Sequence, residues 1–362
     1  MSFTEQKRQE IKKYILRKIA ADDEMIIEKT IDSFGISVTS VKRYLKDFLQ
    51  QSWIRVSEEK KCGYELIEEE HEICVDVSED SYEDMICFDH VVPRLTRFNQ
   101  KARDIWKYVC MEMLNNALEH SNGTEIKIWL KINYLYTTVV IADNGLGVFC
   151  TLLSALKQKG WSSPKQEDAM VELLKGKITC APQQHSGEGI FFSSKMIDHF
   201  AIWSDNRMIS WTASREPRVL QSHLLAYAAR IGKVGTCVMM TLENDTGREM
   251  KNVFDTYADI DQGFYKTEIS VYNACLCDQP ISRSQARRIC KRLEEFKEVE
   301  LDFGEIDFMG QGFADEIFRV YALAHPDVLI SVKNATTDVI RMVYHVARGK
   351  MSENIAFISG NI

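Results

Sequence analysis

Residues 124–145 carry two neighbouring strand patterns, in the sequence TEIKIWLKINYLYTTVVIADNG. In the first, Ile126, Ile128 and Leu130 alternate with polar residues, which is the period-two pattern of a strand with one buried face. The second, TTVVIAD, is a short apolar run typical of a buried strand. This stretch therefore predicts a β-sheet in the middle of the chain.

The rest of the middle segment mixes long helical patterns with further strands. The runs FAIWSD, ISWTA and GTCVMMTLEN each predict a strand. Helices and an antiparallel sheet in one unit favour a two-layer α/β sandwich over residues 91–250. Because 362 residues is long for one domain, the expected fold class is α/β multi-domain.

Residues 1–70 predict three helices followed by a two-stranded hairpin. This order resembles the winged helix-turn-helix family, in which the third helix enters the DNA major groove. The third helical pattern, VTSVKRYLKDFLQQ, predicts an apolar face and a polar face. The candidate DNA-binding residues on the polar face are Thr39, Lys42, Arg43 and Lys46. Dimerisation or partner docking is the alternative, since residues 1–64 carry 13 Lys and Arg against 10 Asp and Glu.

An acidic segment follows. Ten carboxylates lie between Glu65 and Asp84, which predicts an acidic linker at residues 71–90 or a solvated edge. The whole chain has a formal net charge of −8, so nothing at that level points to nucleic acid or an anionic membrane. No apolar run approaches the roughly 18 residues of a membrane span, and the N-terminus lacks the apolar core of a signal peptide. We expect a cytoplasmic protein with no membrane contact, whose ten cysteines are reduced thiols because they form no CxxC pair.

The segment EMLNNALEHS places an acid and an amide on one helical face. Glu112 and Asn116 are four residues apart, so their side chains lie one above the other. An asparagine carbonyl is a hard oxygen ligand suited to Mg²⁺. A carboxylate one turn away can polarise a water molecule aimed at a phosphoryl group, which is the work of a general base.

Two glycine motifs follow along the chain. DNGLG places Asp143 directly after a buried strand, where it can accept a hydrogen bond from an exocyclic amine. Gly145 and Gly147 permit unusual backbone angles and close approach of a ligand. In SGEGIFFSSKM, Gly187 and Gly189 lead into a helix whose N-terminus would face phosphates.

Together and in this order, the three motifs resemble those of the GHKL family of ATP-binding domains, which includes gyrase B, Hsp90, MutL, histidine kinases and anti-sigma-factor kinases. The resemblance implies that ATP is bound, that Asn116 coordinates Mg²⁺ and that Asp143 contacts adenine. It also implies a lid over residues 148–186, and Thr236 as an adenine-side contact. Loaded GHKL domains commonly dimerise, so a homodimer is expected.

The family members differ in chemistry. A histidine kinase needs a phosphoacceptor on a helical hairpin, and His90 lies too close to Asn116 to leave room for one. GHKL ATPases and anti-sigma-factor kinases carry a glutamate at the position of Glu112, so hydrolysis or transfer to serine or threonine is expected. A third possibility is a non-catalytic adaptor gated by the nucleotide. His120 and His185 flank the motifs as further phosphate contacts or as structural residues.

Residues 270–362 predict a small separate α/β domain that resembles STAS-like domains. STAS antagonists of anti-sigma factors carry a phosphorylated serine at a strand–helix junction, where this chain has Gly310 and Gln311. Neither can take a phosphate, so the resemblance implies docking of a protein partner rather than self-phosphorylation. The expected core of its helix is Phe313, Ile317 and Val320.

Overall fold

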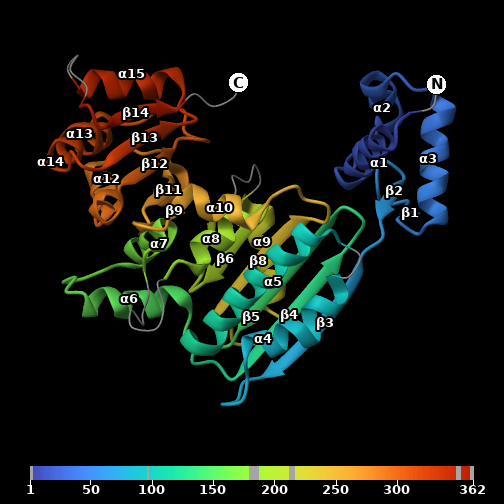
Figure 1. The fold of residues 1–362 in the computed structure, drawn as a ribbon, viewed down its shortest axis with the longest axis horizontal. Coiled ribbons are helices and arrows are strands. Elements are labelled where there is room, and N and C mark those ends of the chain that lie inside the picture. Colours follow the sequence, from blue (N-terminus) through green and yellow to red (C-terminus); the bar gives the residue numbers. More distant parts are fainter. Residues whose placement is uncertain (1–2, 96–97, 179–186, 212–216, 348–351, 359–362) are drawn as a thin grey trace.

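The computed structural model describes residues 3–95, 98–178, 187–211, 217–347 and 352–358, with only the backbone for 217–222. The chain forms three parts, shown in Figure 1: an N-terminal module (residues 3–66), a central domain (69–257) and a C-terminal domain (266–358). The N-terminal module and the C-terminal domain lie at opposite ends of the molecule, with the central sheet between them. The predicted α/β multi-domain fold class is confirmed.

The N-terminal module has the predicted three helices and hairpin. Its elements are α1 (Glu5–Ala20), α2 (Ile26–Phe34), α3 (Val38–Gln50), β1 (Ile54–Val56) and β2 (Tyr64–Leu66). The Ser37 side chain caps α3 by accepting a hydrogen bond from the Ser40 N–H at 3.2 Å. Helical spacing then buries Val41, Leu45 and Phe48 in the core of the module.

A six-stranded antiparallel sheet forms the centre of the molecule, in the order β3-β4-β5-β8-β6-β7. Its strands are β3 (Glu69–Asp76), β4 (Glu125–Ile132), β5 (Tyr136–Asp143), β6 (His199–Ser204), β7 (Arg207–Ser210) and β8 (Thr236–Glu243). The helices of the central domain are α4 (Glu83–Ile86), α5 (Gln100–Asn115), α6 (Val148–Gln158), α7 (Gln166–Lys175), α8 (Gly189–Met196), α9 (Pro217–Ala228) and α10 (Met250–Tyr257). None of the helices within the described residues is long and apolar enough to cross a membrane.

The acidic segment is an edge strand over much of its length. Residues 69–76 pair with β4 as β3, so the predicted linker at 71–90 is wrong there and the alternative of a solvated edge holds. His71, Ile73 and Val75 are partly buried, while the residues between them are exposed. The exposed carboxylates on this edge oppose pairing with other strands, which explains why an acidic stretch can be part of a sheet.

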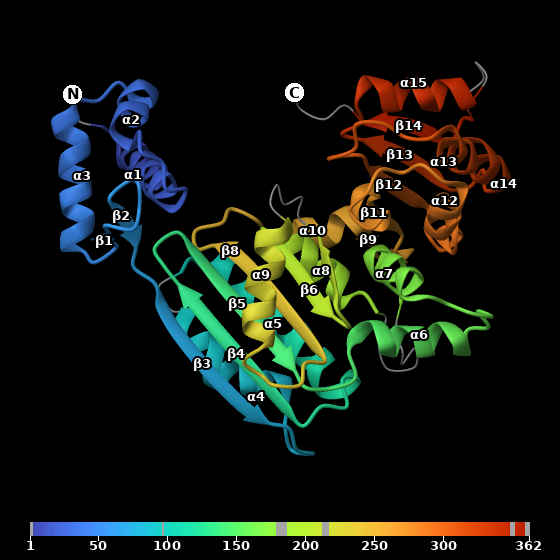
Figure 2. The ribbon, with the colours of Figure 1, turned by 180° about the vertical axis from the view of Figure 1, so that it is seen from behind.

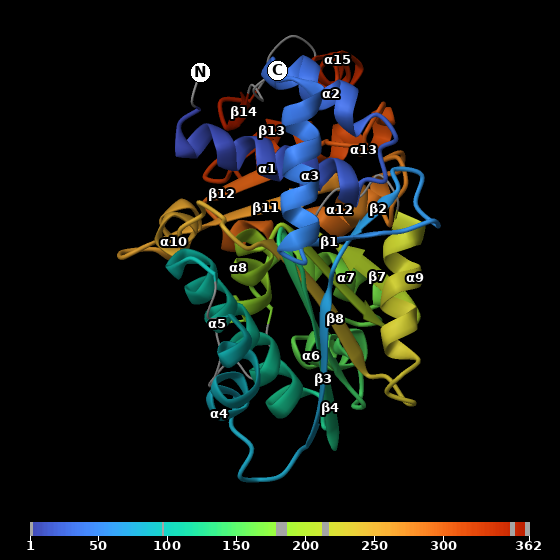
Figure 3. The ribbon, with the colours of Figure 1, turned by 90° about the vertical axis from the view of Figure 1, so that its right-hand side faces the viewer.

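Helices cover both faces of the central sheet, so the predicted two-layer sandwich is incomplete. Figure 3 shows α5 on one side of the strands and α9 on the other, and Figure 2 shows α9 crossing the second face. Leu224, Tyr227 and Ala228 of α9 pack with Trp129 and Trp203 of the sheet. The large apolar side chains on this second face need a cover, and α9 provides it.

The C-terminal domain has a four-stranded parallel sheet in the order β11-β12-β13-β14. Its elements are β11 (Lys266–Ser270), α11 (Val271–Ala274), α12 (Arg283–Cys290), β12 (Glu298–Asp302), α13 (Gln311–Asp315), α14 (Ala322–Ala324), β13 (Leu329–Lys333), α15 (Thr337–Val346) and β14 (Ile355–Ile358). The first strand therefore begins at Lys266, before the predicted boundary at residue 270. A small hairpin of β9 (Ala258–Asp259) and β10 (Gly263–Phe264) precedes it.

One core residue of this domain was predicted wrongly. Phe313 and Ile317 are fully buried as expected, but Val320 is 39% exposed. Residues Glu316–Tyr321 form a π-helical turn, which is wider than an α-helical turn and shifts the phase of the buried face. Phe318 and Tyr321 fill the core in place of Val320.

The central and C-terminal domains share one apolar core, so the C-terminal domain is not the separate unit that the sequence predicted. Phe191 of α8 lies 4.7 Å from the Phe264 ring, measured between ring centroids. Phe264 in turn lies 5.3 Å from Phe296 of the C-terminal domain. Because these rings pack as closely as those inside a single domain, the two sheets are fixed to one another.

The N-terminal module docks on the turn between β4 and β5. The Trp53 ring stacks on Tyr134 with 3.7 Å between centroids, and Leu135 is buried in the core of the module. Two ion pairs, Lys13–Asp245 and Arg17–Glu243, join α1 to the end of β8. The module is thus attached to the end of β5 opposite to Asp143.

We expect Tyr134→Ala to loosen this attachment by about 1–3 kcal/mol, because the stacked ring and its buried area are lost. Hydrogen exchange of the α1 amides should become faster, while that of α5 stays unchanged. Tyr344→Ala is the matched control, because Tyr344 is 50% exposed and stacks on Phe357 far from the module. Equal α1 exchange in both variants would contradict the docking role.

Candidate functional site

A cavity of about 380 Å³ lies in the central domain, lined by α5, α6, α7, α8 and the ends of β5 and β8. Its volume falls within the range of small-molecule sites. Seven of the eight residues predicted for the nucleotide site line it: Glu112, Asn116, Asp143, Gly147, Gly187, Gly189 and Thr236. The eighth, Gly145, lies beside it and donates its N–H to Asp143 Oδ1 at 2.8 Å.

Asp143 is a buried carboxylate at the last position of β5 and is only 4% exposed. Burial raises the pKa of Asp143 to about 6, although hydrogen bonds with Gly145 and Thr236 oppose the shift. At neutral pH the carboxylate is mostly ionised and can only accept hydrogen bonds. A desolvated acceptor that lines a cavity is the kind of group that binding sites use.

Close packing explains the glycines around Asp143. A Cβ on Gly235 would overlap Asp143 Oδ1 and lie 2.6 Å from the Gly145 nitrogen. A Cβ on Gly145 would overlap the carbonyl group of Ser121, which accepts the Leu146 N–H at 2.7 Å. Gly145 therefore allows the turn after β5 to pack on the end of α5, which the sequence pattern alone did not predict.

Thr236 connects the base of the cavity to the start of α6. Its Oγ1 accepts the Val148 N–H at 3.0 Å, and its side chain also bonds to Asp143. Gly147 precedes α6 with a φ of +90°, a backbone angle that favours glycine. The segment that leads into the predicted lid is thus fixed at its first residue.

Glu112 lies against the N-terminus of α8. A Cβ on Gly189, the first residue of α8, would overlap Glu112 Oε2. Gly187 reaches this helix with a φ of +77°, so the glycine turn and helix start are where the motif predicts them. The amide end that was expected to face phosphates is therefore faced by the protein's own carboxylate, a favourable position for a negative charge.

One candidate functional residue in the cavity, Tyr108, was missed by the sequence analysis. Tyr108 lies one helical turn before Glu112 and forms a side-chain hydrogen bond with it. Burial, with the nearby charges of Glu112 and Glu188, raises the pKa of Tyr108. The i,i+4 spacing of Tyr108 and Glu112 was the available signal. His120 also lines the cavity, whereas His185 lies outside the described residues.

Asn116 begins a π-helical turn, Asn116–His120, that continues α5 into the cavity wall. No hydrogen bond joins its side chain to another residue in the described part of the chain. Across the same residues, no cluster of three or more His, Cys, Asp or Glu could hold a metal ion. A hard cation at Asn116 would therefore take most of its ligands from water and from a bound molecule.

The four candidate DNA-binding residues, Thr39, Lys42, Arg43 and Lys46, are all exposed on α3. Among the described residues, none of the three cations forms an ion pair. Because these cations have no carboxylate partners, no ion pair has to break before they contact phosphates. This face of α3 is well separated from the cavity, across the docking contact at Tyr134.

At the strand–helix junction before α13, the backbone of residues 280–281 packs directly against Gly310 and leaves no space for a side chain there. A Cβ on Gly310 would overlap the carbonyl oxygen of Ile281, and the Gly310 N–H donates to Pro280 O at 2.8 Å. Asp315 and Glu316 after it pair with Arg283, at 2.7 and 3.3 Å. Both acids therefore have structural partners.

The raised pKa of Asp143 sets a pH dependence of stability. The pKa in the folded protein is about 6 against 3.8 in the unfolded chain, so the folded state binds the proton more tightly. The free energy by which this group stabilises the fold is therefore largest below pH 3.8, where the carboxyl is protonated in both states, and it is lost as pH rises through 6. We expect Asp143→Asn to raise the ligand-free free energy of unfolding at pH 7.5 by about 1–3 kcal/mol.

Urea unfolding at pH 4 and pH 7.5 would measure this difference, which should nearly vanish at pH 4. Asp338→Asn is the control, because its side chain is 70% exposed on α15. A stabilisation equal at both pH values would contradict the role of burial.

Comparison with known families bears on the C-terminal domain. Residues 285–339 match the family model of a STAS-like domain of unknown function (DUF4325). The match runs from α12 through α13 and β13 to the start of α15. No curated protein matches the chain. This part of the chain is therefore similar to STAS-like domains, and we call the C-terminal domain (266–358) the STAS-like domain.

Proposed function

We propose that the central domain is a GHKL-type domain that binds ATP with Mg²⁺, and that its nucleotide state gates binding of DNA or a protein partner by the flanking parts. The observation that carries the proposal is the convergence of seven predicted residues, six from three separate motifs and Thr236 from a later strand, on one cavity. These residues come from a stretch of more than 120 positions, from Glu112 to Thr236.

The base of the cavity suits a purine with an exocyclic amine. Asp143 offers an ionised acceptor that has only backbone N–H and Thr236 hydroxyl partners. An amine donor would give this desolvated carboxylate a further partner, which offsets part of its burial cost. A side chain at Gly235 would collide with Asp143 Oδ1, so glycine there keeps this carboxylate in its place.

The opposite wall suits phosphates and a hard cation. Asn116 offers its carbonyl oxygen, and the N-terminus of α8 offers backbone amides. A bound magnesium ion would neutralise phosphate charge and orient the phosphates. Binding a phosphate at α8 would require the Glu112 carboxylate to move from Gly189, and Glu112 is long enough to rotate away.

Glu112 is the proposed general base. On α5 it lies one turn from Asn116, so a water molecule near the cation could hydrogen-bond to its carboxylate. Tyr108 donates a hydrogen bond to Glu112 in this structure. Transfer to a serine or threonine of a separate protein is the rival chemistry; no described residue at the Gly310 junction favours it within this chain.

Gating is proposed from the attachment of both flanking parts to the nucleotide domain. The N-terminal module packs on the β4–β5 turn through Tyr134, at the other end of the strand that carries Asp143. The STAS-like domain packs on α7 and α8, which line the cavity. The exposed cations of α3 are the proposed DNA contacts, and the STAS-like domain is the proposed site for a protein partner.

We expect wild-type protein to bind ATP only with magnesium, and Asp143→Asn to weaken that affinity at least tenfold, because a neutral amide replaces the ionised acceptor for the amine. Glu112→Ala should leave affinity within threefold but slow phosphate release at least 100-fold, since general bases contribute about 10²–10⁴ in rate. Isothermal titration and a phosphate-release assay would measure both effects, with Asp338→Asn as the control.

The outcomes separate the rival functions. No magnesium-dependent affinity for ATP in the wild type would overturn the proposal. Label from ATP on a separate STAS partner would favour the kinase. Normal signalling without turnover, unaffected by Glu112→Ala, would favour the adaptor.

For DNA, we expect Arg43→Ala and Lys46→Ala each to weaken binding to bulk duplex and to reduce the salt slope by about one. Lost phosphate contacts act evenly across sequences, so the loss should not depend on the duplex chosen. Fluorescence anisotropy from 50 to 200 mM salt would measure the slope, with Arg341→Ala of the distant α15 as control. An unchanged slope would exclude α3 as the contact.

A further inference from the structure

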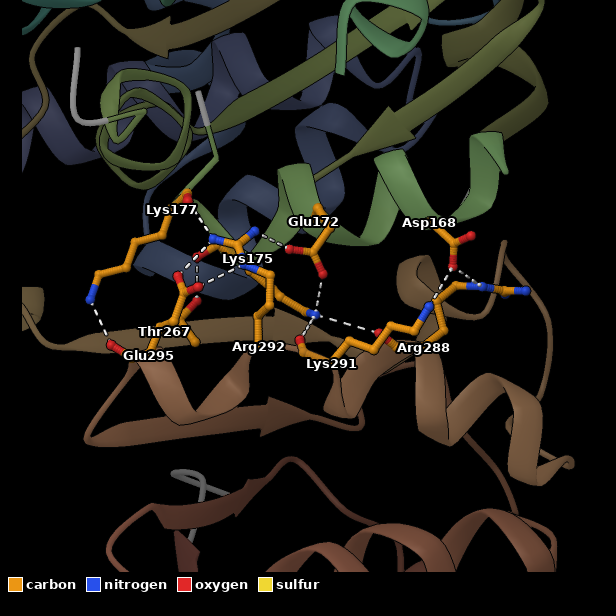
Figure 4. A network of polar contacts seen from close by, with 9 residues as sticks. All are labelled: Asp168, Glu172, Lys175, Lys177, Thr267, Arg288, Lys291, Arg292 and Glu295. Atoms are coloured by element: carbon orange, nitrogen blue, oxygen red, sulfur yellow. Dashed lines mark hydrogen bonds and ion pairs between the residues drawn. The ribbon is translucent and has the colours of Figure 1, made fainter. Parts of the chain in front are cut away.

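The STAS-like domain holds α7 through a buried network of charged groups, shown in Figure 4. We call this network the α7 clamp. It joins Asp168, Glu172, Lys175 and Lys177 of the central domain to Thr267, Arg288, Lys291, Arg292 and Glu295 of the STAS-like domain. At its centre, the Glu172 and Lys175 side chains are only 1% and 2% exposed.

Arg292 and Lys175 share the Glu172 carboxylate. Lys175 Nζ lies 2.5 Å from Glu172 Oε1, and Arg292 Nη1 lies 2.5 Å from Glu172 Oε2. Lys175 also donates to the main-chain carbonyl oxygens of Arg288 and Lys291. The bonds from Lys175 to these carbonyl oxygens and the pair of Arg292 with Glu172 cross between the two domains, whereas the pair of Lys175 with Glu172 lies within α7.

Further bonds extend the clamp in both directions. Thr267 Oγ1 donates to the Lys175 carbonyl oxygen at 2.8 Å, and Lys177 Nζ donates to Glu295 O at 2.8 Å. At the other end of α7, Asp168 lies 3.5 Å from Arg288. The helix is thus held along its whole length, and not at one point.

Two residues that line the cavity lie close in sequence to the clamp residues. Leu173 and Ile178 belong to the cavity wall and flank the clamp residues Lys175 and Lys177 in sequence. Between them, Gly176 has a φ of +90°, and a Cβ there would lie 2.6 Å from Phe191 of α8. A displacement of α7 would therefore move the cavity wall directly.

A second cavity wall is attached to the same domain. Lys195 of α8 lies 2.6 Å from Glu268 of β11, and Lys333 lies 2.9 Å from the same carboxylate. Burial alone would raise the pKa of Glu268, but the two lysines outweigh it and lower the pKa to about 2. The ion pair is therefore present at every pH near neutrality.

The loop before α7 is held less closely. A hollow of about 680 Å³ separates residues 160–164 from the STAS-like domain, and Lys291 over the Trp161 ring at 3.9 Å bridges it. Within the predicted lid, the contacts with the STAS-like domain are therefore concentrated on α7.

We propose that the STAS-like domain is an internal regulator of the cavity: through the α7 clamp it holds one wall in the position that admits the ligand, and ligand binding is coupled in return to the state of the STAS-like domain. Breaking one buried partner leaves the others uncompensated, so the clamp behaves as one unit. Coupling between two sites is reciprocal by linkage. The identity of the ligand as ATP rests on the proposed function; the mechanical coupling does not.

The first test needs no ligand. The triple variant Glu172→Leu, Lys175→Met, Arg292→Leu removes all three central charges together, so that none is left buried and unpaired. Hydrogen exchange of the α7 amides should become at least tenfold faster, while that of α3 stays unchanged. Arg341→Leu is the matched control, because it breaks an exposed pair with Asp338 in the same domain.

If the triple variant does not fold, Arg292→Lys serves in its place. Lysine keeps the charge but cannot reach both Glu172 and Glu295 as Arg292 does, so α7 exchange should rise at least threefold. Exchange in α7 equal to that of the wild type in the folded variant would overturn the proposal.

The second test adds magnesium and ATP to the full chain. In the wild type, exchange of the α12 amides should change at least threefold on binding, and the clamp variant should bind ATP more than threefold more weakly. Binding that leaves α12 unchanged, or a smaller loss of affinity, would overturn the coupling. If the wild type binds no ATP, the proposed function fails, and the ligand-free exchange of α7 alone decides whether the clamp holds the wall.

Discussion

The burial of one carboxylate, Asp143, organises the central domain. It lies at the end of β5, in the middle of the six-stranded sheet, where the surrounding apolar side chains raise its pKa to about 6. Such a group is tolerated only with donors around it, and the Gly145 amide and Thr236 supply them. Gly235 must then lack a side chain. The turn, the start of α6 and the base of the cavity all follow from these contacts.

The three parts of the molecule are joined by packing contacts on both sides of the cavity. β5 runs from the turn that contacts the N-terminal module at Tyr134 to the carboxylate of Asp143. On the other side, α7 and α8 form cavity walls and lie against the STAS-like domain. A change in the cavity therefore has two rigid routes outward, one along a strand and one across buried ion pairs.

Local patterns in the sequence were sufficient for most elements and for the cavity residues. Alternation predicted β4 and β5, and the spacing within three motifs identified residues such as Glu112 and Asn116. The predictions that were wrong concern features set by contacts between residues far apart in the sequence or by irregular helical turns. The cover provided by α9 and the edge position of β3 depend on the whole sheet, and the exposure of Val320 depends on a π-helical turn.

The clamp shows the same limit, because Glu172 and Arg292 are 120 positions apart and each resembles an ordinary surface residue in the sequence. The aromatic rings of Phe191, Phe264 and Phe296 pack continuously across the junction between the two domains. Separating the two domains would expose an apolar surface on each of them. An unrelated domain substituted for the STAS-like domain would not match the apolar surface that the central domain presents at this junction.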